Sequence, residues 1–256
     1  MAEERLITKE DIKGRMKKIK HKIAVLSAKG GVGKSTVAAL IAVHYARKKK
    51  SVGIFDVDMF GPSIPKLFGI EDKRIMVKAD GIEPTFTEKY DIKVISIHYA
   101  LPRKETPVMW MGPVVASTIR DLLGKVEWGE LDYLIFDLPP GTGDEPLVVM
   151  ENVELDGAVI VMTPHELSAA IVEKAINMTR KLNVEILGIV ENMSYFECPK
   201  CGEIIYPFGK RRVVDLAKKY GLTILAEIPI DSELARLSEL GRIEEYEYDY
   251  FETLLL

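Results

Sequence analysis

The sequence predicts an α/β fold in which a mainly parallel, doubly wound sheet carries helices on both faces. Two observations lead to this prediction. Short runs rich in Val, Ile and Leu alternate along the chain with amphipathic stretches of helical length, and this alternation is typical of strand–helix–strand units. Several of the strand-like runs are almost continuously apolar, as expected for strands that are covered on both faces.

The expected elements follow one another along a single domain of 256 residues, 1–256, because no repeat or low-complexity linker interrupts them. Residues 58–90 contain many Gly and Pro and are expected to be mostly irregular. A short basic N-terminal segment (1–20), an insertion (193–209) and an acidic tail (241–256) complete the domain, and the tail is expected to pack on the surface or to fray. Strands are expected at 22–27, 51–55, 92–97, 133–137, 157–163, 185–190 and 223–228, and helices at 35–48, 113–124, 166–182, 211–220 and 231–240.

Composition limits the possible functions. The chain is 47% hydrophobic and 29% charged, which is ordinary for a globular protein. Its net charge of −4 does not favour a nucleic-acid partner, and no apolar run approaches the roughly eighteen residues of a membrane span. The tail also lacks the basic face of a membrane-surface helix. With two cysteines in one C-x-x-C, we expect a cytoplasmic protein without nucleic-acid or membrane partners.

A phosphate-binding loop follows the first expected strand. Residues 28–36 read AKGGVGKST and lead directly into the first expected helix, which is the strand–loop–helix setting that such a loop requires. Its glycines let backbone N–H groups turn inward, and the helix N-terminus adds partial positive charge facing the phosphates. Lys34 is expected to reach the β- and γ-phosphates, and the Ser35 hydroxyl to ligate magnesium. The residues expected to bind the nucleotide here are Gly30, Gly31, Val32, Gly33, Lys34, Ser35 and Thr36.

Acidic residues end two of the other expected strands. Asp56 and Asp58 follow the strand 51–55, and Asp137 ends the strand 133–137 and is followed by LPPGTGDE. Such residues are also common helix caps. However, ligands of open α/β sheets bind outside the carboxyl ends of the strands. Together with the phosphate-binding loop, these acids therefore indicate a nucleotide site.

The loop resembles the deviant Walker A motif of the P-loop NTPases that include MinD, ParA, the arsenite-pump ATPase and the nitrogenase iron protein, within the SIMIBI class. Ala28 replaces the usual first glycine, and Lys29 is the additional lysine of that motif. The resemblance implies a homodimer in which Lys29 crosses the interface to the partner's nucleotide. It also implies that Asp58 positions the attacking water, so that Lys29, Lys34 and Asp58 are catalytic.

The same resemblance extends to the metal and the base. It places Asp56 in the shell of a magnesium ion that Asp137 holds through water, with Ser35 as a direct ligand. Asn192, just after the strand 185–190, and Pro229 match positions that contact adenine in this family. The choice of ATP over GTP rests on the resemblance alone.

The cysteine pair lies in NMSYFECPKCG, between an expected strand and the next expected helix. Cys198 and Cys201 are spaced to present two ligands to one metal centre. Because a four-iron cluster or a tetrahedral zinc needs about four protein ligands, a twofold axis would supply the missing half. The residues by themselves leave four states open: an iron–sulfur cluster, a zinc ion, a redox dithiol or an unliganded pair.

Four motifs in this order, KGGVGKST, DVDMFGPSIP, DLPPGTGDE and NMSYFECPKCG, resemble the Mrp/ApbC family of ATP-binding iron–sulfur cluster carriers over about residues 20–235. The resemblance implies an ATPase, slow without a partner, that holds a labile [4Fe–4S] cluster between two subunits and transfers it to apo iron–sulfur proteins. The alternative is a MinD/ParA-like positioning ATPase with structural zinc, or no metal, at the cysteine pair.

Overall fold

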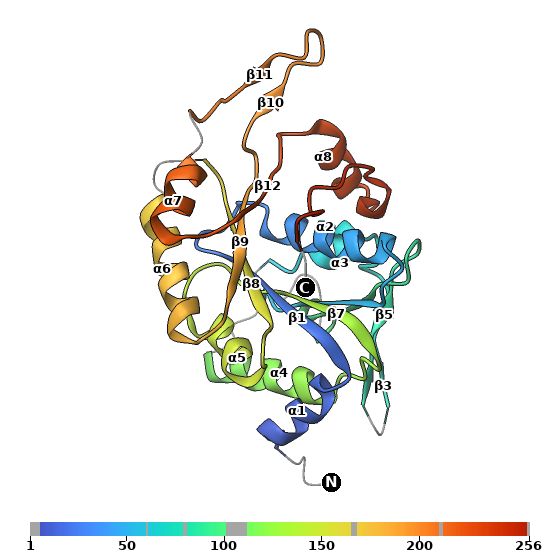
Figure 1. Cartoon of the computed structure of the whole chain (residues 1–256). Coiled ribbons are helices and arrows are strands. Elements are labelled where there is room, and N and C mark those ends of the chain that lie inside the picture. The colour runs from blue at the N-terminus through green and yellow to red at the C-terminus, as the bar shows by residue number, and fades with distance from the viewer. Residues whose placement is uncertain are drawn as a thin grey trace.

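The computed structural model describes residues 6–59, 61–78, 81–100, 112–164, 168–209 and 212–254. An eight-stranded sheet, ordered β12-β9-β8-β1-β7-β2-β6-β5, forms the centre of the molecule (Figure 1). Every strand of this sheet runs parallel to its neighbours except the edge strand β5, which is antiparallel to β6. The strands are β1 (Ile19–Ser27), β2 (Val52–Asp56), β5 (Thr85–Phe86), β6 (Lys93–Ser96), β7 (Leu131–Asp137), β8 (Gly157–Met162), β9 (Ile186–Glu191) and β12 (Ile224–Glu227).

Helices cover both faces of the sheet, which confirms the predicted doubly wound architecture. Side chains alternate along β1, where Ile23 and Val25 join one core cluster and Ala24 and Leu26 join the cluster on the other face. The first face is covered by α2 (Lys34–Arg47), α3 (Ile64–Leu67) and α8 (Ser232–Glu239). The second face is covered by α1 (Lys9–Met16), α4 (Gly112–Lys125), α5 (Asp144–Asn152), α6 (Ser168–Lys181) and α7 (Arg212–Tyr220).

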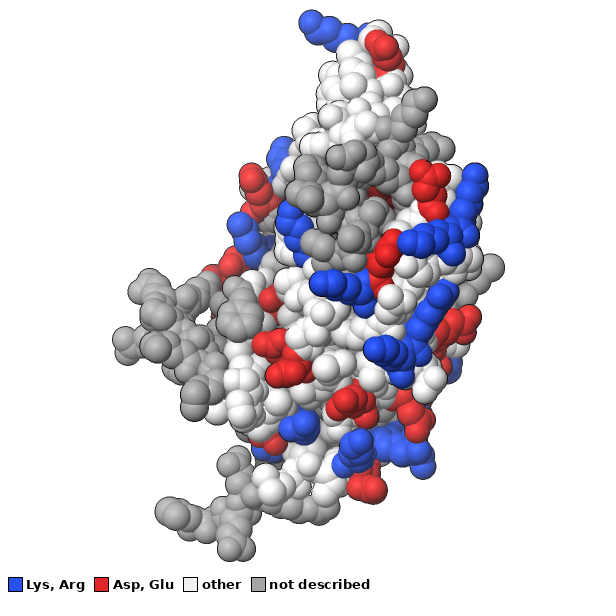
Figure 2. All heavy atoms as spheres, turned by 90° about the vertical axis from the view of Figure 1, so that its left-hand side faces the viewer, with Lys and Arg blue, Asp and Glu red and all other residues white. Residues whose placement is uncertain are grey.

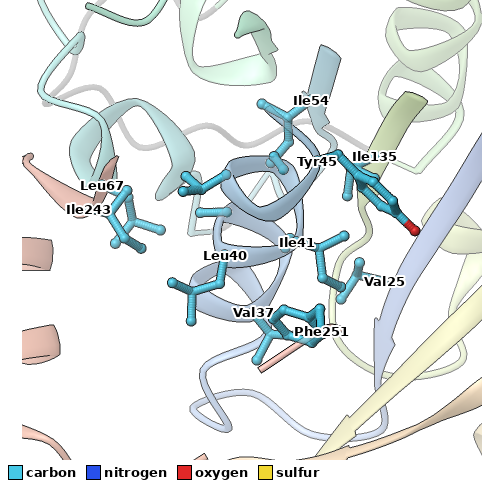
Figure 3. Packing of buried hydrophobic residues seen from close by; sticks show 14 of the residues in the cluster. Val25, Val37, Leu40, Ile41, Tyr45, Ile54, Leu67, Ile135, Ile243 and Phe251 are labelled. Atoms are coloured by element: carbon cyan, nitrogen blue, oxygen red, sulfur yellow. The ribbon is translucent and has the colours of Figure 1, made fainter. Parts of the chain in front are cut away.

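The helix α2, which begins at the phosphate-binding loop, is buried along most of its length. Figure 3 shows Ile41 and Tyr45 of α2 beside Val25, Ile54 and Ile135 of the sheet. Burying one such aliphatic side chain contributes on the order of 1.5–3 kcal/mol. The packing therefore fixes the start of α2, and with it the phosphate-binding loop, against the carboxyl end of β1.

All seven predicted strands and all five predicted helices occur, with boundaries shifted by up to three residues. The first residues of the predicted helices 166–182 and 211–220 lie outside the described residues. The prediction missed α1, α3 and α5, together with several very short elements. These are β3 (Met76–Val77), β4 (Ile82–Glu83), β5, β10 (Phe196–Glu197), β11 (Ile204–Ile205) and the 3-10 turns at Ile97–Ala100 and Ile243–Glu245.

The helix α1 had a local sequence signal that the prediction did not use. Thr8 and Asp11 form a capping box at its N-terminus, an arrangement that satisfies two otherwise unpaired N–H groups. Ile12 and Met16 are buried against the second face of the sheet. The basic residues of the N-terminal segment are thus divided among α1, β1 and the turn between them.

The C-terminal tail is built into the core, so the expectation that it packs on the surface or frays was wrong. Tyr246, Phe251 and Leu254 are at most 2% exposed and belong to the core cluster around α2. The Tyr45 hydroxyl of α2 donates a hydrogen bond to the carbonyl of Leu254 at 3.1 Å. Glu245, Glu247 and Glu252 of the tail are exposed, whereas Glu244 is buried and accepts a hydrogen bond from the Thr87 hydroxyl at 2.6 Å. The exposed acids are the reason why the composition of the tail suggested a surface segment.

A buried histidine joins α2 to the tail. His44 Nδ1 lies 2.7 Å from both carboxylate oxygens of Asp249, while its Nε2 is buried without a partner among the described residues. Burial lowers the pKa of His44, although the Asp249 carboxylate acts in the opposite direction. Burial alone would raise the pKa of Asp249, but hydrogen bonds from the Phe251 N–H and from His44 hold it below its ordinary value. Above pH 6.5 the ring is therefore mostly neutral, and the Asp249 carboxylate favours the tautomer that donates through Nδ1–H.

This pair predicts a loss of stability in mild acid. Because the pKa of folded His44 lies below its ordinary value of 6.5, the unfolded chain binds the proton first and the free energy of unfolding falls as the pH drops through 6.5. We expect His44→Leu to flatten this part of the profile, as measured by urea unfolding between pH 7.5 and 5. Parallel profiles for His44→Leu and the wild type would contradict the prediction.

Candidate nucleotide site and cysteine hairpin

The phosphate-binding loop connects the end of β1 to the start of α2. Gly31 and Gly33 have φ values of 80° and 78°, a region that favours glycine. Space also requires glycine at position 33, because an added Cβ would lie 2.1 Å from Asn192 Nδ2. The loop, the first turn of α2 and residues of the 58–63 and 140 segments line a pocket of about 380 Å³, within the size range of small-ligand sites.

Lys34 lies at the bottom of this pocket and is paired with acidic residues. Its Nζ is 2.6 Å from Asp137 Oδ1, 3.6 Å from Asp58 Oδ2 and 3.3 Å from the hydroxyl of Ser35. Burial disfavours the ammonium, but the neighbouring carboxylates outweigh it and raise the pKa of Lys34. The lysine is therefore charged and positioned to exchange a carboxylate partner for a phosphate.

Asp56 and Asp137 end neighbouring strands and are direct register partners. Asp56 accepts hydrogen bonds from the N–H groups of Asp58 and Ile64, at 3.2 and 3.3 Å, and from the Ser96 hydroxyl at 2.9 Å. Burial first, and then the charge of Asp137, raise the pKa of Asp56 to about 8. Burial also raises the pKa of Asp137. Two carboxylates this deeply buried favour a cation between or beside them.

The donor set at this edge fits magnesium. Asp137 Oδ2 is buried and has no hydrogen-bond partner among the described residues, so an acceptor remains available beside Lys34. Carboxylate and hydroxyl oxygens are the ligands that magnesium prefers. The predicted ligands Ser35, Asp56 and Asp137 thus lie together at one edge of the sheet, and their role in metal binding stays a prediction.

The predicted adenine contacts also lie at this edge. Asn192 follows β9, and its Nδ2 donates a hydrogen bond to the Val32 carbonyl of the phosphate-binding loop at 2.9 Å. Pro229 follows β12, and its neighbour Ile228 accepts a hydrogen bond from the Ser194 N–H at 2.9 Å. The two segments are therefore adjacent and close to the loop. Asn192 already holds the loop in this structure, and contact with a purine stays a prediction for both residues.

The predicted catalytic residues have different surroundings. Lys34 and Asp58 are buried, at 6% and 8% exposure, and form an ion pair. Lys29 is exposed on the outer side of the loop. An exposed lysine at this position is available to a second subunit, as the resemblance requires, and its contact with a partner's nucleotide stays a prediction.

The cysteines lie at the tip of a two-stranded β-hairpin that projects from the body of the molecule (Figure 1). Within the tip, the Cys198 N–H donates to the Glu203 carbonyl and the Gly202 N–H to the Cys198 carbonyl, both at 2.9 Å. The backbone N–H of Lys200, followed by that of Cys201, lowers the pKa of Cys198. A lower pKa favours the thiolate, which is the form that binds metals.

One chain presents two thiols rather than a complete metal site. Among the described residues there is no group of three or more His, Cys, Asp or Glu side chains that could hold a metal ion. The hairpin also exposes apolar side chains to solvent, and Figure 2 shows that its surface is largely uncharged below the tip. These exposed side chains are Phe196, Ile204, Ile205 and Phe208.

Two residues of this region were missed in the sequence. Ser96 ends β6 and donates to Asp56, and Glu191 ends β9 as a fully buried carboxylate. No local pattern distinguishes Ser96. Glu191 had a signal in the sequence, because it directly continues an apolar strand. A glutamate in that position is rarely buried unless it has a specific partner, so a polar partner could have been predicted for it.

The remaining surface adds two observations. On the face drawn in Figure 2, acidic and basic side chains are interspersed over the body of the molecule. Among the described residues, no helix combines the length and the apolar character that crossing a membrane requires.

Comparisons with known proteins identify relatives of the whole domain. A curated iron–sulfur cluster carrier protein from Methanocaldococcus jannaschii is 47% identical over 240 residues, which cover 93% of this chain and 82% of the relative. A protein of the same description from Aquifex aeolicus is 47% identical over 224 residues, covering 87% of this chain. The match spans 61% of the length of the Aquifex protein, less than two thirds.

Solved structures agree with this relationship. The nucleotide-binding protein of Archaeoglobus fulgidus in complex with ADP is 54% identical and has a TM-score of 0.88 over 98% of both chains. The septum site-determining protein MinD of Pyrococcus horikoshii, with Mg-ADP, is 20% identical with a TM-score of 0.62 over 90% of both chains, which shows a shared fold. The family model described as ParA, NUBPL iron-transfer P-loop NTPase, matches residues 18–252. The chain therefore belongs to the NUBPL iron-transfer P-loop NTPase family.

Proposed function

We propose that this protein is an ATP-binding and ATP-hydrolysing carrier that binds an iron–sulfur cluster through Cys198 and Cys201 and transfers it to apoproteins. The observation that supports this most directly is the placement of two thiols, one with a lowered pKa, at the exposed tip of a hairpin. That hairpin leaves the sheet at the carboxyl edge, where the phosphate-binding loop also lies. The relatives named as iron–sulfur cluster carriers support the same assignment.

The nucleotide part of the proposal rests on the loop and its acids. Gly30, Gly31 and Gly33 line the pocket that would hold the phosphates. Lys34, which is paired with Asp137 in this structure, would exchange this carboxylate for a phosphate of the bound nucleotide. Magnesium, held by Ser35 with Asp56 and Asp137 in its shell, would neutralise phosphate charge. Asp58 is placed to orient a water molecule at the pocket, where it lines the wall. The ADP in the Archaeoglobus relative supports a nucleotide at this site.

The cargo part of the proposal requires two chains. A [4Fe–4S] cluster is held by about four cysteine thiolates, and each chain supplies two at its hairpin tip. A homodimer with a twofold axis between the tips completes the ligand set. The exposed Phe196 and Ile205 are register partners on one face of the hairpin, so they would exclude water from the bridging cluster. We place this dimer in the cytoplasm, with apo iron–sulfur proteins as recipients.

The positioning ATPase considered as the alternative is less well supported. The similarity to MinD is a similarity of fold at 20% identity. A positioning ATPase would use the cysteines at the hairpin tip for structural zinc at most. Metal analysis separates the two, because a zinc-stapled protein would hold zinc and no sulfide.

Reconstitution tests the proposal. We expect anaerobically reconstituted wild type to bind about four iron and four sulfide ions per two chains, and Cys198→Ala to lose nearly all of this binding. Iron and acid-labile sulfide are measured after desalting. Lys200→Ala is the matched control, because it changes the same turn but keeps the backbone N–H that faces Cys198. A wild type that binds no more iron than Cys198→Ala would overturn the carrier function.

A further inference from the structure

Glu191 holds both ends of the segment that contains the cysteine hairpin. It is the last residue of β9 and is fully buried. One carboxylate oxygen accepts the Ser194 hydroxyl at 2.6 Å, and the other accepts the backbone N–H of Val213 at 3.2 Å. Ser194 lies just before the hairpin and Val213 lies in the first turn of α7, just after it. One side chain therefore fixes where the hairpin leaves the body and where it returns.

The residue next to Glu191 touches the phosphate-binding loop. Asn192 Nδ2 donates to the Val32 carbonyl at 2.9 Å, and an added Cβ on Gly33 would lie 2.1 Å from the same Nδ2. The Asn192 N–H in turn donates to the Met162 carbonyl of β8 at 2.8 Å. The loop backbone at positions 32 and 33 therefore lies directly against the Asn192 side chain.

These contacts form one continuous path of hydrogen bonds and covalent bonds within a single chain. It runs from the Val32 carbonyl to Asn192, along one peptide bond to Glu191, and from its two oxygens to Ser194 and Val213. A fully buried carboxylate is costly unless its hydrogen bonds are satisfied. Its bonds to the two hairpin ends are therefore strong and directional, which suits the transmission of a small displacement.

We propose that Glu191 is a positioning residue that couples the nucleotide state of the phosphate-binding loop to the position of the cysteine hairpin. For its biological meaning this inference rests on the proposed carrier function, in which nucleotide turnover controls how firmly the thiols hold their cargo. The coupling itself lies within one chain and needs neither cargo nor a dimer. Because coupling between two binding equilibria is reciprocal, a metal ion that binds the thiols more tightly in one nucleotide state changes nucleotide affinity by the same factor.

Thiol reactivity of the cluster-free full chain measures the coupling. The rate of alkylation of Cys198 and Cys201 by N-ethylmaleimide is compared without nucleotide, with Mg-ADP and with a non-hydrolysable ATP analogue. We expect nucleotide to change the wild-type rate by about 5-fold or more, the lower end of typical coupling. Glu191→Gln should bring this ratio close to 1 while its ADP affinity stays within about 2-fold of wild type. The same ratio is expected for the monomeric protein, because the path lies within one chain.

Two further variants keep the result decisive. Ser194→Ala removes one of the two hydrogen bonds to the Glu191 carboxylate and leaves the charge of Glu191 in place. It should reduce the ratio of the alkylation rates with and without nucleotide, and this variant decides the question if Glu191→Gln does not fold. Glu173→Gln makes the same chemical change on α6, where Glu173 pairs with Lys219 of α7 at 2.7 Å, and should match wild type. A wild-type ratio of 1, or a full ratio in Ser194→Ala and Glu191→Gln, overturns the coupling. Iron binding is measured separately, so failure of the carrier function is distinguishable.

Discussion

Replacing Lys29 with alanine should lower ATP turnover by about 10³-fold or more, the range of a charged residue that contacts the transferring phosphoryl group from a partner. Lys29 is exposed on the loop, whereas Lys34 of the same loop is buried against Asp137. We therefore expect Lys29→Ala to bind ADP normally and Lys34→Ala to lose nucleotide affinity. Lys48→Ala, at the exposed far end of α2, is the control and should turn over ATP as wild type does.

A mixing experiment distinguishes action across the dimer from action within one chain. The Lys29→Ala subunit keeps an intact nucleotide pocket, and the Lys34→Ala subunit keeps Lys29. If Lys29 reaches the partner's nucleotide, equal amounts of the two inactive variants should regain turnover as mixed dimers form. Turnover that stays at the level of the separate variants would show that Lys29 does not act across a dimer interface.

Truncating Phe251 to alanine should cost about 3–5 kcal/mol of the free energy of unfolding, the usual range for a buried aromatic residue. Phe251 is 1% exposed, and its ring lies edge-on to His44 at a centroid distance of 6.2 Å. Figure 3 shows it against Val37 of the helix that follows the phosphate-binding loop. The loss should appear in urea unfolding as a lower midpoint with an unchanged slope.

Tyr248 offers the matched control for this change. It lies three residues earlier in the same tail and is 65% exposed, so Tyr248→Ala should stay within about 0.5 kcal/mol of wild type. Equal, small effects at both positions would mean that the tail contributes little to the core. A large effect at Phe251 alone would establish that the last turn of the chain stabilises α2.

Long elements were predictable because each has its own periodic signal. The apolar runs of β1, β7 and β8 identify buried strands directly, and the glycines before Lys34 identify the turn into α2. The helix α5 was missed because its sequence begins within LPPGTGDEP, where Gly and Pro indicate a loop. The tail was misjudged for a related reason, since burial of Phe251 depends on α2, two hundred residues away in the chain.

The site shows the same division. The glycine loop, Asp56 and Asp137 follow from motif and strand position, and the fold brings them together. The hydrogen bonds from Ser96 to Asp56 and from Asn192 to Val32 join segments 40 and 160 residues apart. No local pattern encodes such pairs, because they exist only after the strands have taken their order in the sheet.

The hairpin begins and ends at nearly the same point, since residues 194 and 213 are both bonded to Glu191. The two ends of the hairpin therefore stay in place at Glu191 when the hairpin itself is shortened or lengthened, and β9 and α7 do not have to move. Changes in such an appendage alter loop-closure entropy only slightly. The fold therefore allows the length and the tip chemistry of the hairpin to change without rebuilding the core of the ATPase body.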